Sequence, residues 1–305
     1  TVSNLDELIT ALDAGKTTIS LNAGTYDFTA APEAATSFSS GVLTINTPLV
    51  LKGVSKAGVK PVIVGSIKFA EGVTSFTAQG LAFNGNEQAL GNAFEVAAAL
   101  AATNIIIRDC EIYGYKKSLF YGNAEGTVNN LTFNRLLVHD MGTGQGMIDI
   151  RKQLYAAVVI ENSTFYNGGR DFIRLDGNGT TTVKSASIRN NTFSAISIDA
   201  GNSILYVRSA DLATNYVVEN NLFLNETGET TILAKSGTQV PVMNNNWFYK
   251  CTSTAFWTGP IDQATATGNG GGVLEADPCA DSAKGSFKLT NTEMKNSKVG
   301  DPRWW

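Results

Sequence analysis

Residues 186–193 read ASIRNNTF and residues 216–223 read YVVENNLF, and this shared pattern decides the fold. In each segment apolar residues stand at every second position, Ala186 and Ile188 in one and Tyr216 and Val218 in the other, before a short polar run and a large apolar residue that ends the pattern. Alternation with a period of two is typical of a strand with one buried face, and the helical period of about 3.6 residues is absent. We therefore interpret both segments as β-strands at equivalent positions of a repeat.

The same pattern recurs along the chain at intervals of about 27 residues. The apolar residues that end it are Phe83, Ile112, Val138, Phe165, Phe193, Phe223 and Phe248. A second strand follows in each repeat, for example GMIDIRK at 146–152 and DFIRLDG at 171–177. Several strands per repeat, stacked in register, predict an all-β parallel β-helix, a single-stranded solenoid.

Asparagines occupy a fixed place in the later repeats. Asn162, Asn190, Asn220 and Asn245 each stand three residues before the large apolar residue. A side-chain amide can donate to the repeat above and accept from the repeat below. We therefore predict that these four residues form a stacked asparagine ladder at a turn.

We predict one domain, residues 1–305. Residues 1–30 form an N-terminal cap, with a short helix that begins after Ser3, and lead into the first coil. The coils span about residues 31–262. The irregular stretch at about 263–305 is a C-terminal cap, in which Trp304 and Trp305 cover the last coil.

The composition excludes several functions. Charged residues make up 16% of the chain, against about 25% on average, while Asn and Gly number 27 and 30. A net charge of −4 without a basic run argues against nucleic-acid binding. His139 is the only histidine, which excludes multi-histidine zinc sites, and we interpret it as a turn residue. Cys110, Cys251 and Cys279 cannot form a disulfide framework; one bridge with a spare thiol and no bridge at all both stay open.

Alignment of the second strands places outward-facing residues in two neighbouring rows. The first row is Glu95, Tyr121, Asp149, Arg174, Tyr206 and Leu233, and the second is Asn123, Arg151, Asp176, Arg208 and Lys235. The same alignment pairs the inward residues Leu205 and Ile232. Adjacent coils lie about 4.8 Å apart, so the two rows predict one continuous patch.

The patch holds four cations and two anions on a chain that is acidic overall. Arginine binds carboxylates through two parallel hydrogen bonds, so a row of arginines suits the acidic sugars of a polyuronate. Tyr206 and Trp257 offer rings on which sugars could stack. We interpret Asp149, Arg151, Arg174, Asp176, Tyr206, Arg208, Lys235 and Trp257 as the ligand-binding residues.

Two alternatives stay open. In a purely structural solenoid the patch is a cross-strand charge ladder, in which Asp149 pairs with Arg174 and Asp176 lies between Arg151 and Arg208. In a polysaccharide lyase, Lys235 or Arg208 would be the base and Tyr206 the acid of a β-elimination. Asp149 and Asp176 are then weak candidates for Ca²⁺, and no other cofactor is expected.

The chain also resembles a known family. The asparagine-rich coils, LNAGTYDF at residues 21–28 and GDPRWW at residues 300–305 are similar to pectate-lyase-like right-handed β-helix domains of surface lipoproteins from Gram-negative polysaccharide-utilisation systems. The resemblance implies a monomer that is secreted or anchored at the outer membrane, or that lies in the periplasm, and that holds polysaccharide beside outer-membrane transport proteins. Relatives with the same fold are lyases or hydrolases. Because the sequence begins at Thr1 without a signal-peptide core, we expect a piece of a longer protein.

Overall fold

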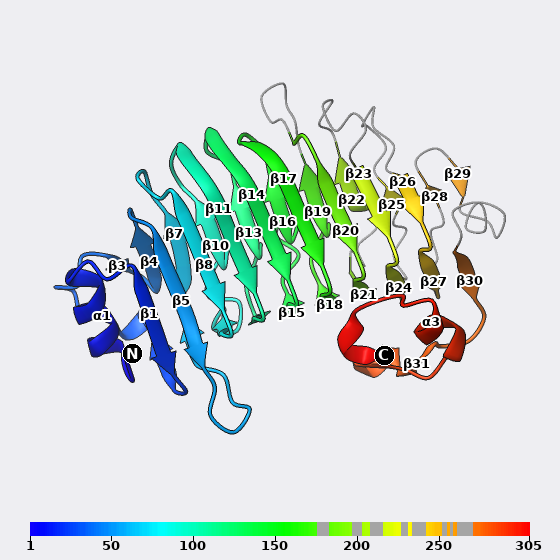
Figure 1. The fold of residues 1–305 in the computed structure, drawn as a ribbon, viewed down its shortest axis with the longest axis horizontal. Helices are drawn as coiled ribbons and strands as arrows, with labels where there is room; N and C mark the ends of the chain where they lie inside the picture. The colour runs from blue at the N-terminus through cyan, green and yellow to red at the C-terminus, as the bar shows by residue number, and fades with distance from the viewer. Residues whose placement is uncertain are drawn as a thin grey trace.

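The computed structural model describes residues 1–175, 183–196, 203–207, 216–226, 231–233, 242–251, 255–256, 259–260 and 271–305. Three long sheets of parallel strands run along the molecule, and successive coils lie side by side from the N-terminal to the C-terminal end (Figure 1). Each coil supplies one short strand to each sheet. The predicted all-β parallel β-helix is therefore confirmed.

The strands of the three sheets follow one another in the same order in successive coils. Sheet A contains β1 (Thr18–Asn22), β5 (Leu49–Val54), β8 (Ser75–Gln79), β11 (Leu100–Arg108), β14 (Gly126–Asn134), β17 (Leu154–Glu161), β20 (Ala186–Arg189), β23 (Tyr216–Glu219) and β26 (Val242–Asn244). Sheet B contains β2 (Thr25–Asp27), β6 (Val62–Val64), β9 (Ala82–Asn84), β12 (Glu111–Tyr113), β15 (Leu137–Met141), β18 (Thr164–Gly168), β21 (Thr192–Ser194), β24 (Leu222–Leu224), β27 (Trp247–Tyr249) and β30 (Gly272–Leu274). Sheet C contains β3 (Phe38–Ser39), β4 (Val42–Ile45), β7 (Ser66–Phe69), β10 (Phe94–Val96), β13 (Phe120–Gly122), β16 (Ile148–Ile150), β19 (Ile173–Leu175), β22 (Ser203–Val207) and β25 (Thr231–Leu233), in which only β3 is antiparallel to its neighbour.

The core is a set of in-register columns of apolar side chains. The large residues that end each sequence repeat pair one after another in sheet B, from Phe83 to Phe248, as the repeat predicts. Ring centroids of the last four phenylalanines in this column lie 5.5, 5.0 and 5.2 Å apart, in nearly parallel planes. Each sequence segment forms two strands, because the polar run turns the chain from sheet A into sheet B.

The asparagine ladder is one residue later than predicted. Asn162, Asn190, Asn220 and Asn245 have φ angles of 54°, 54°, 55° and 51°. Asparagine tolerates this left-handed conformation better than most residues with a side chain, so these four residues turn the chain. Among them, Asn245 Nδ2 donates to Asn220 Oδ1 at 2.8 Å, near the surface.

The buried ladder consists of the neighbouring residues Asn191, Asn221 and Asn246. Asn191 Nδ2 donates to Asn221 Oδ1 at 3.1 Å, and Asn221 Nδ2 donates to Asn246 Oδ1 at 3.0 Å. The same oxygens accept from the backbone N–H groups of Asn191 and Asn221. In the coil before Asn191 this corner holds buried Ser163, whose backbone N–H donates to Asn191 Oδ1 at 3.1 Å. In the three coils before that one it holds Leu81, Cys110 and Leu136.

The N-terminal cap contains the predicted helix. Helix α1 (Leu5–Asp13) begins after Asn4, not Ser3, because the Asn4 side chain accepts from Glu7 N at 2.9 Å. Glu7 in turn accepts from the backbone of Ser3, which satisfies a second free N–H at the helix start. The coils begin earlier than residue 31, since β1 and β2 already belong to sheets A and B.

The C-terminal segment, residues 271–305, folds back beside β21, β24 and β27 (Figure 1). It starts with β30, which still pairs with β27, so the coils extend beyond residue 262. Its remaining elements are β31 (Cys279–Asp281), η2 (Ser282–Lys284), β32 (Ser286–Leu289), α3 (Thr292–Asn296) and η3 (Pro302–Trp304). Before this segment, β28 (Ala255–Phe256) pairs antiparallel with β29 (Gly259–Pro260), and η1 (Phe28–Ala30) follows β2.

The GDPRWW sequence clamps this segment onto sheet B. Thr164 Oγ1 donates to Asp301 Oδ2 at 2.7 Å, and Trp304 Nε1 donates to Thr164 Oγ1 at 2.7 Å. Arg303 forms an ion pair with Asp301 at 2.9 Å. The prediction that Trp304 covers the last coil is therefore wrong, because its partner lies in β18, three strands before β27 in sheet B.

Candidate functional site

The first predicted row exists on the outer face of sheet C. Glu95 pairs with Tyr121, Tyr121 with Asp149, Asp149 with Arg174, and Arg174 with Tyr206. One residue from each of five successive strands therefore lies side by side on this face. The row is the part of the predicted site that the alignment placed correctly.

Charges in the described part of this row are paired. Lys68 extends the row upstream and lies 3.9 Å from Glu95. Arg151 binds both oxygens of Asp149, at 2.9 and 2.8 Å, and its guanidinium lies 5.6 Å from the centre of the Tyr121 ring.

Asp149 is completely buried beneath these neighbours. A ligand on this face would therefore meet Arg151 and not Asp149, which corrects the prediction of direct contact for Asp149. The half-buried side chain of Arg174 lies in the adjacent strand. What sheet C presents here is a guanidinium group held in place by a buried carboxylate and an aromatic ring.

The predicted register fails in the last coil of sheet C. Leu205 pairs with Leu233, whereas the alignment paired Leu205 with Ile232 and Tyr206 with Leu233. The slip by one residue arises because the connection between β22 and β25 differs in length from the earlier ones, and sequence spacing alone does not show which residue is inserted.

Several predicted site residues lie outside the described part of the chain. These are Asp176, Arg208, Lys235 and Trp257, while Tyr206 is described by its backbone in β22. The Ca²⁺ hypothesis concerned Asp149 and Asp176. Both oxygens of Asp149 are occupied by Arg151, and the described residues contain no group of three or more potential metal-ligating His, Cys, Asp or Glu side chains.

A second group of polar and aromatic side chains lies on the outer face of sheet B. Tyr113, His139 and Tyr166 pair in successive strands, and their rings stack in nearly parallel planes. The centre of the His139 ring lies 5.1 Å from the centre of each tyrosine ring. His139 is therefore the middle of an aromatic stack, and its interpretation as a simple turn residue is wrong.

Two carboxylates hold the His139 ring in this stack. Nδ1 lies 2.7 Å from Asp140 Oδ2, and Nε2 lies 3.1 Å from Glu111 Oε1. Burial lowers the pKa of His139, but the hydrogen bonds to both carboxylates outweigh it, and the pKa is raised above its ordinary value of 6.5. The hydrogen bond from His139 lowers the pKa of Glu111. Both shifts favour a charged imidazolium beside an ionised Glu111 carboxylate.

Each end of the stack lines a cavity. Tyr113 contributes to one of about 430 Å³, whose other walls include the polar side chains of Glu87, Gln88 and Asp140. Tyr166 contributes to one of about 640 Å³, which lies between sheet B and residues 282–285 of the C-terminal segment. Both volumes fall within the range of about 300–1,000 Å³ that is typical of small-molecule sites.

A signal for the aromatic stack was present in the sequence. Tyr113, His139 and Tyr166 each follow the large apolar residue of their repeat, so the repeat alignment itself puts them in one column. The wall formed by residues 282–285 has no such signal, because that segment is not part of the repeat.

All three cysteines are free thiols. Burial raises the pKa of Cys110 and of Cys279 to about 12 and raises that of Cys251 as well. The thiolate is the reactive form, so none of the three is suited to nucleophilic chemistry. Of the two possibilities that the sequence left open, one disulfide bridge or none, the structure has none.

Fold and surface together define a parallel β-helix protein with a charged row on one sheet and an aromatic stack on another. The family model described as domain of unknown function DUF4957 matches residues 24–168, and the one described as domain of unknown function DUF5123 matches residues 158–304. The two matches meet at β17 and β18, where sheet B continues without interruption. No curated protein and no solved structure matches the chain.

In the part of the chain that the structure describes, no helix has the length and apolar character needed to cross a membrane.

Proposed function

We propose that the protein captures an acidic polysaccharide along the outer face of sheet C. The observation that carries this proposal is the row of polar and aromatic residues whose backbones pair in register on five successive strands. A solenoid repeats the same outward position about every 4.8 Å, and such extended surfaces suit a ligand that itself repeats.

The chemistry of the row supports an anionic ligand. Arg151 is fixed by two hydrogen bonds to buried Asp149 and by the ring of Tyr121, so little side-chain freedom is lost when it binds. A guanidinium group matches the geometry of a sugar carboxylate. Arg174 in the next strand supplies a second guanidinium.

The proposed setting is the cell surface, with outer-membrane transport proteins as partners. Support comes from the resemblance of the coils and of the GDPRWW terminus to pectate-lyase-like domains of surface lipoproteins. Capture without turnover is the preferred activity, because buried Asp149, a Ca²⁺ candidate of the lyase alternative, has both carboxylate oxygens bound by Arg151.

Affinity electrophoresis in gels that contain polygalacturonate or alginate tests the proposal. We expect the wild-type protein to be retarded by at least one of these glycans. Arg174→Ala should weaken retention about tenfold, the effect of losing one charge-assisted hydrogen bond. Arg208→Ala, a change outside the described residues, should act in the same direction.

Arg108→Ala is the matched control. Arg108 is an exposed arginine of β11 on sheet A, where it donates to Gln79, and its removal should leave retention unchanged. Unaltered mobility of the wild-type protein in every acidic glycan would contradict capture and favour a structural solenoid. Growth of ultraviolet absorbance from unsaturated products, with or without Ca²⁺, would instead identify a lyase.

A further inference from the structure

The cavity of about 640 Å³ between sheet B and the C-terminal segment lies on a different face from the row on sheet C. One wall belongs to the solenoid and the other to residues 282–285. These two walls come from distant parts of the sequence and are brought together by the clamp at Asp301 and Trp304.

The solenoid wall is built by a second column of left-handed residues. Asn167, Ala195, Asn225 and Lys250 have φ angles of 54°, 53°, 55° and 49°. Asn167 lies near the end of β18, and the other three lie just beyond β21, β24 and β27. Because every coil turns at the same point, these four side chains form one row along the cavity. The Tyr166 ring lies at one end of the row, and the Lys250 ammonium lies at the other.

The opposite wall is held at a fixed distance by hydrogen bonds. Asn225 Nδ2 donates to Ser194 Oγ at 3.1 Å and to Ser282 Oγ at 2.9 Å, so one amide bridges both walls. Both serines are 3% exposed and lie at the base of the cavity. Gly285 has a φ of 77° and approaches the Tyr166 ring, which closes the aromatic end.

Two lysine residues line the cavity from opposite walls. Lys284 of η2 pairs with Asp281 at 2.9 Å, whereas Lys250 lies 5.3 Å from the centre of the Tyr249 ring. Lys250 forms no ion pair with any residue of the described ranges. An anion that enters the cavity would therefore find a cation without a competing carboxylate.

We propose that this cavity binds a single sugar acid, a hexuronate. An aromatic ring accommodates the apolar face of a sugar, the side-chain amide oxygens of Asn167 and Asn225 accept from its hydroxyls, and Lys250 neutralises its carboxylate. The cavity volume matches a small ligand of this kind. The proposal does not depend on whether sheet C captures a polysaccharide.

Calorimetric titration of the full chain with galacturonate and mannuronate tests the proposal, with glucose and acetate as neutral and non-sugar controls. We expect one uronate to bind and both controls to fail. Lys250→Gln should weaken uronate binding about tenfold, because a charge-assisted contact is lost. Ala283→Trp, which fills the cavity and removes no charge, should abolish binding.

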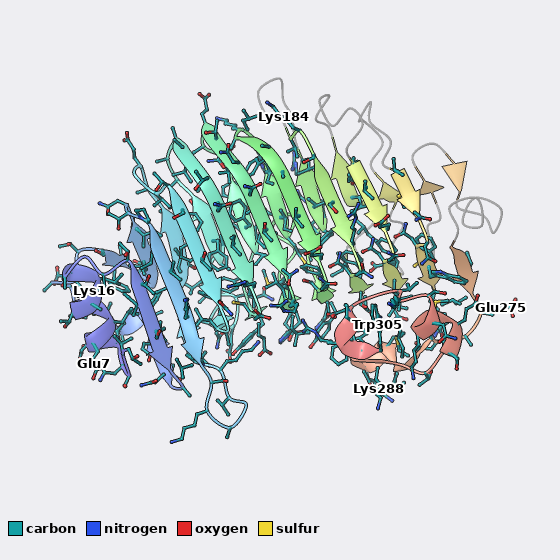
Figure 2. The ribbon with its side chains drawn as sticks, in the orientation of Figure 1. Glu7, Lys16, Lys184, Glu275, Lys288 and Trp305 are labelled. Carbon is teal, nitrogen blue, oxygen red and sulfur yellow. The ribbon has the colours of Figure 1, made fainter. Side chains whose placement is uncertain are left out.

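Lys288→Gln is the matched control, because Lys288 is an exposed lysine of the same segment that projects away from the strands (Figure 2). The proposal is overturned if no uronate binds in the millimolar range, if glucose or acetate binds equally well, or if binding survives both Lys250→Gln and Ala283→Trp. Arg174→Ala separates the two sites. It should reduce polysaccharide retention on sheet C and leave uronate binding in the cavity unchanged.

Discussion

At the scale of single residues, His139 combines two kinds of stabilisation in one side chain. Its ring stacks between Tyr113 and Tyr166, and its two nitrogens face Glu111 and Asp140. The side chain is only 14% exposed, so solvent screens these interactions weakly. A charged imidazolium in this position holds three adjacent strands of sheet B together.

We predict that His139→Phe, which keeps an aromatic ring in the stack, lowers stability in a pH-dependent manner. The folded-state pKa of His139 is raised above 6.5, so its contribution is fully present below about pH 6.5 and is lost as the pH rises through that folded-state pKa. The pKa of Glu111 is lowered, so its contribution is present above its ordinary pKa of 4.5 and is lost as the pH falls through its folded-state pKa. We expect a deficit of about 1–2 kcal/mol near pH 5.5 and a smaller one near pH 9.

Urea unfolding of both proteins at the two pH values measures this difference. Because the chain has one histidine, its imidazole NMR signals report the folded-state pKa directly. Equal deficits at both pH values, or a titration midpoint below 6.5, would contradict the prediction.

At the scale of elements, two adjacent asparagines at the corner between sheets A and B have different structural roles. Asn220 supplies a left-handed turn, while Asn221 supplies a buried amide that satisfies the coils on both sides. Asn221 Nδ2 also donates to Ile188 O at 2.9 Å. The first residue is needed for its backbone conformation and the second for its side chain.

This division predicts opposite responses to glycine. Asn220→Gly should change the free energy of unfolding by less than about 1 kcal/mol, since glycine adopts a φ of 55° readily. Asn221→Gly should cost about 3 kcal/mol or more, because it leaves the buried Asn191 N–H without its acceptor and removes the amide donor to Ile188 O. Equilibrium unfolding of the two variants measures both changes in the free energy of unfolding. A larger loss of stability for Asn220→Gly than for Asn221→Gly would contradict this division and favour the ladder position predicted from the sequence.

At the scale of the whole molecule, the C-terminal segment turns one face of a uniform solenoid into a surface with a cavity. Its attachment depends on Asp301, which is 2% exposed and binds Thr164 and Arg303. A small hydrophobic cluster, which includes Phe287, Met294 and Val299, packs the segment against β24.

We predict that Asp301→Ala releases the segment while the coils stay folded. Loss of the buried hydrogen bonds of Asp301 should cost about 2–3 kcal/mol locally. Limited proteolysis should then cut within residues 275–300, circular dichroism should stay close to that of the wild type, and uronate binding should disappear. Lys288→Ala is the control and should resist proteolysis as the wild type does; unchanged resistance of Asp301→Ala would show that the hydrophobic cluster alone holds the segment.

Much of the fold was predictable from the sequence because a solenoid is nearly one-dimensional. Because each coil contacts mainly its neighbours, the spacing between Phe165, Phe193 and Phe223 is enough to predict which strands pair. The row from Glu95 to Tyr206 on sheet C was predictable for the same reason. Which asparagines form the ladder was not predictable from the sequence, because two adjacent asparagines recur in each of these repeats. Only the backbone geometry distinguishes the residue that turns the chain from the residue that forms the ladder.

The sequence by itself determined the repeat, the parallel strands, the apolar columns and the row on sheet C, because these follow from local periodicity. Tertiary structure alone decided that Asp149 is buried under Arg151, that His139 is stacked between two rings, and that residues 282–285 close a cavity against Asn225 and Lys250. The physical reason is that side-chain burial and contacts with a non-repeating segment depend on three-dimensional packing. A one-dimensional pattern records which residues share a column, but not what covers that column.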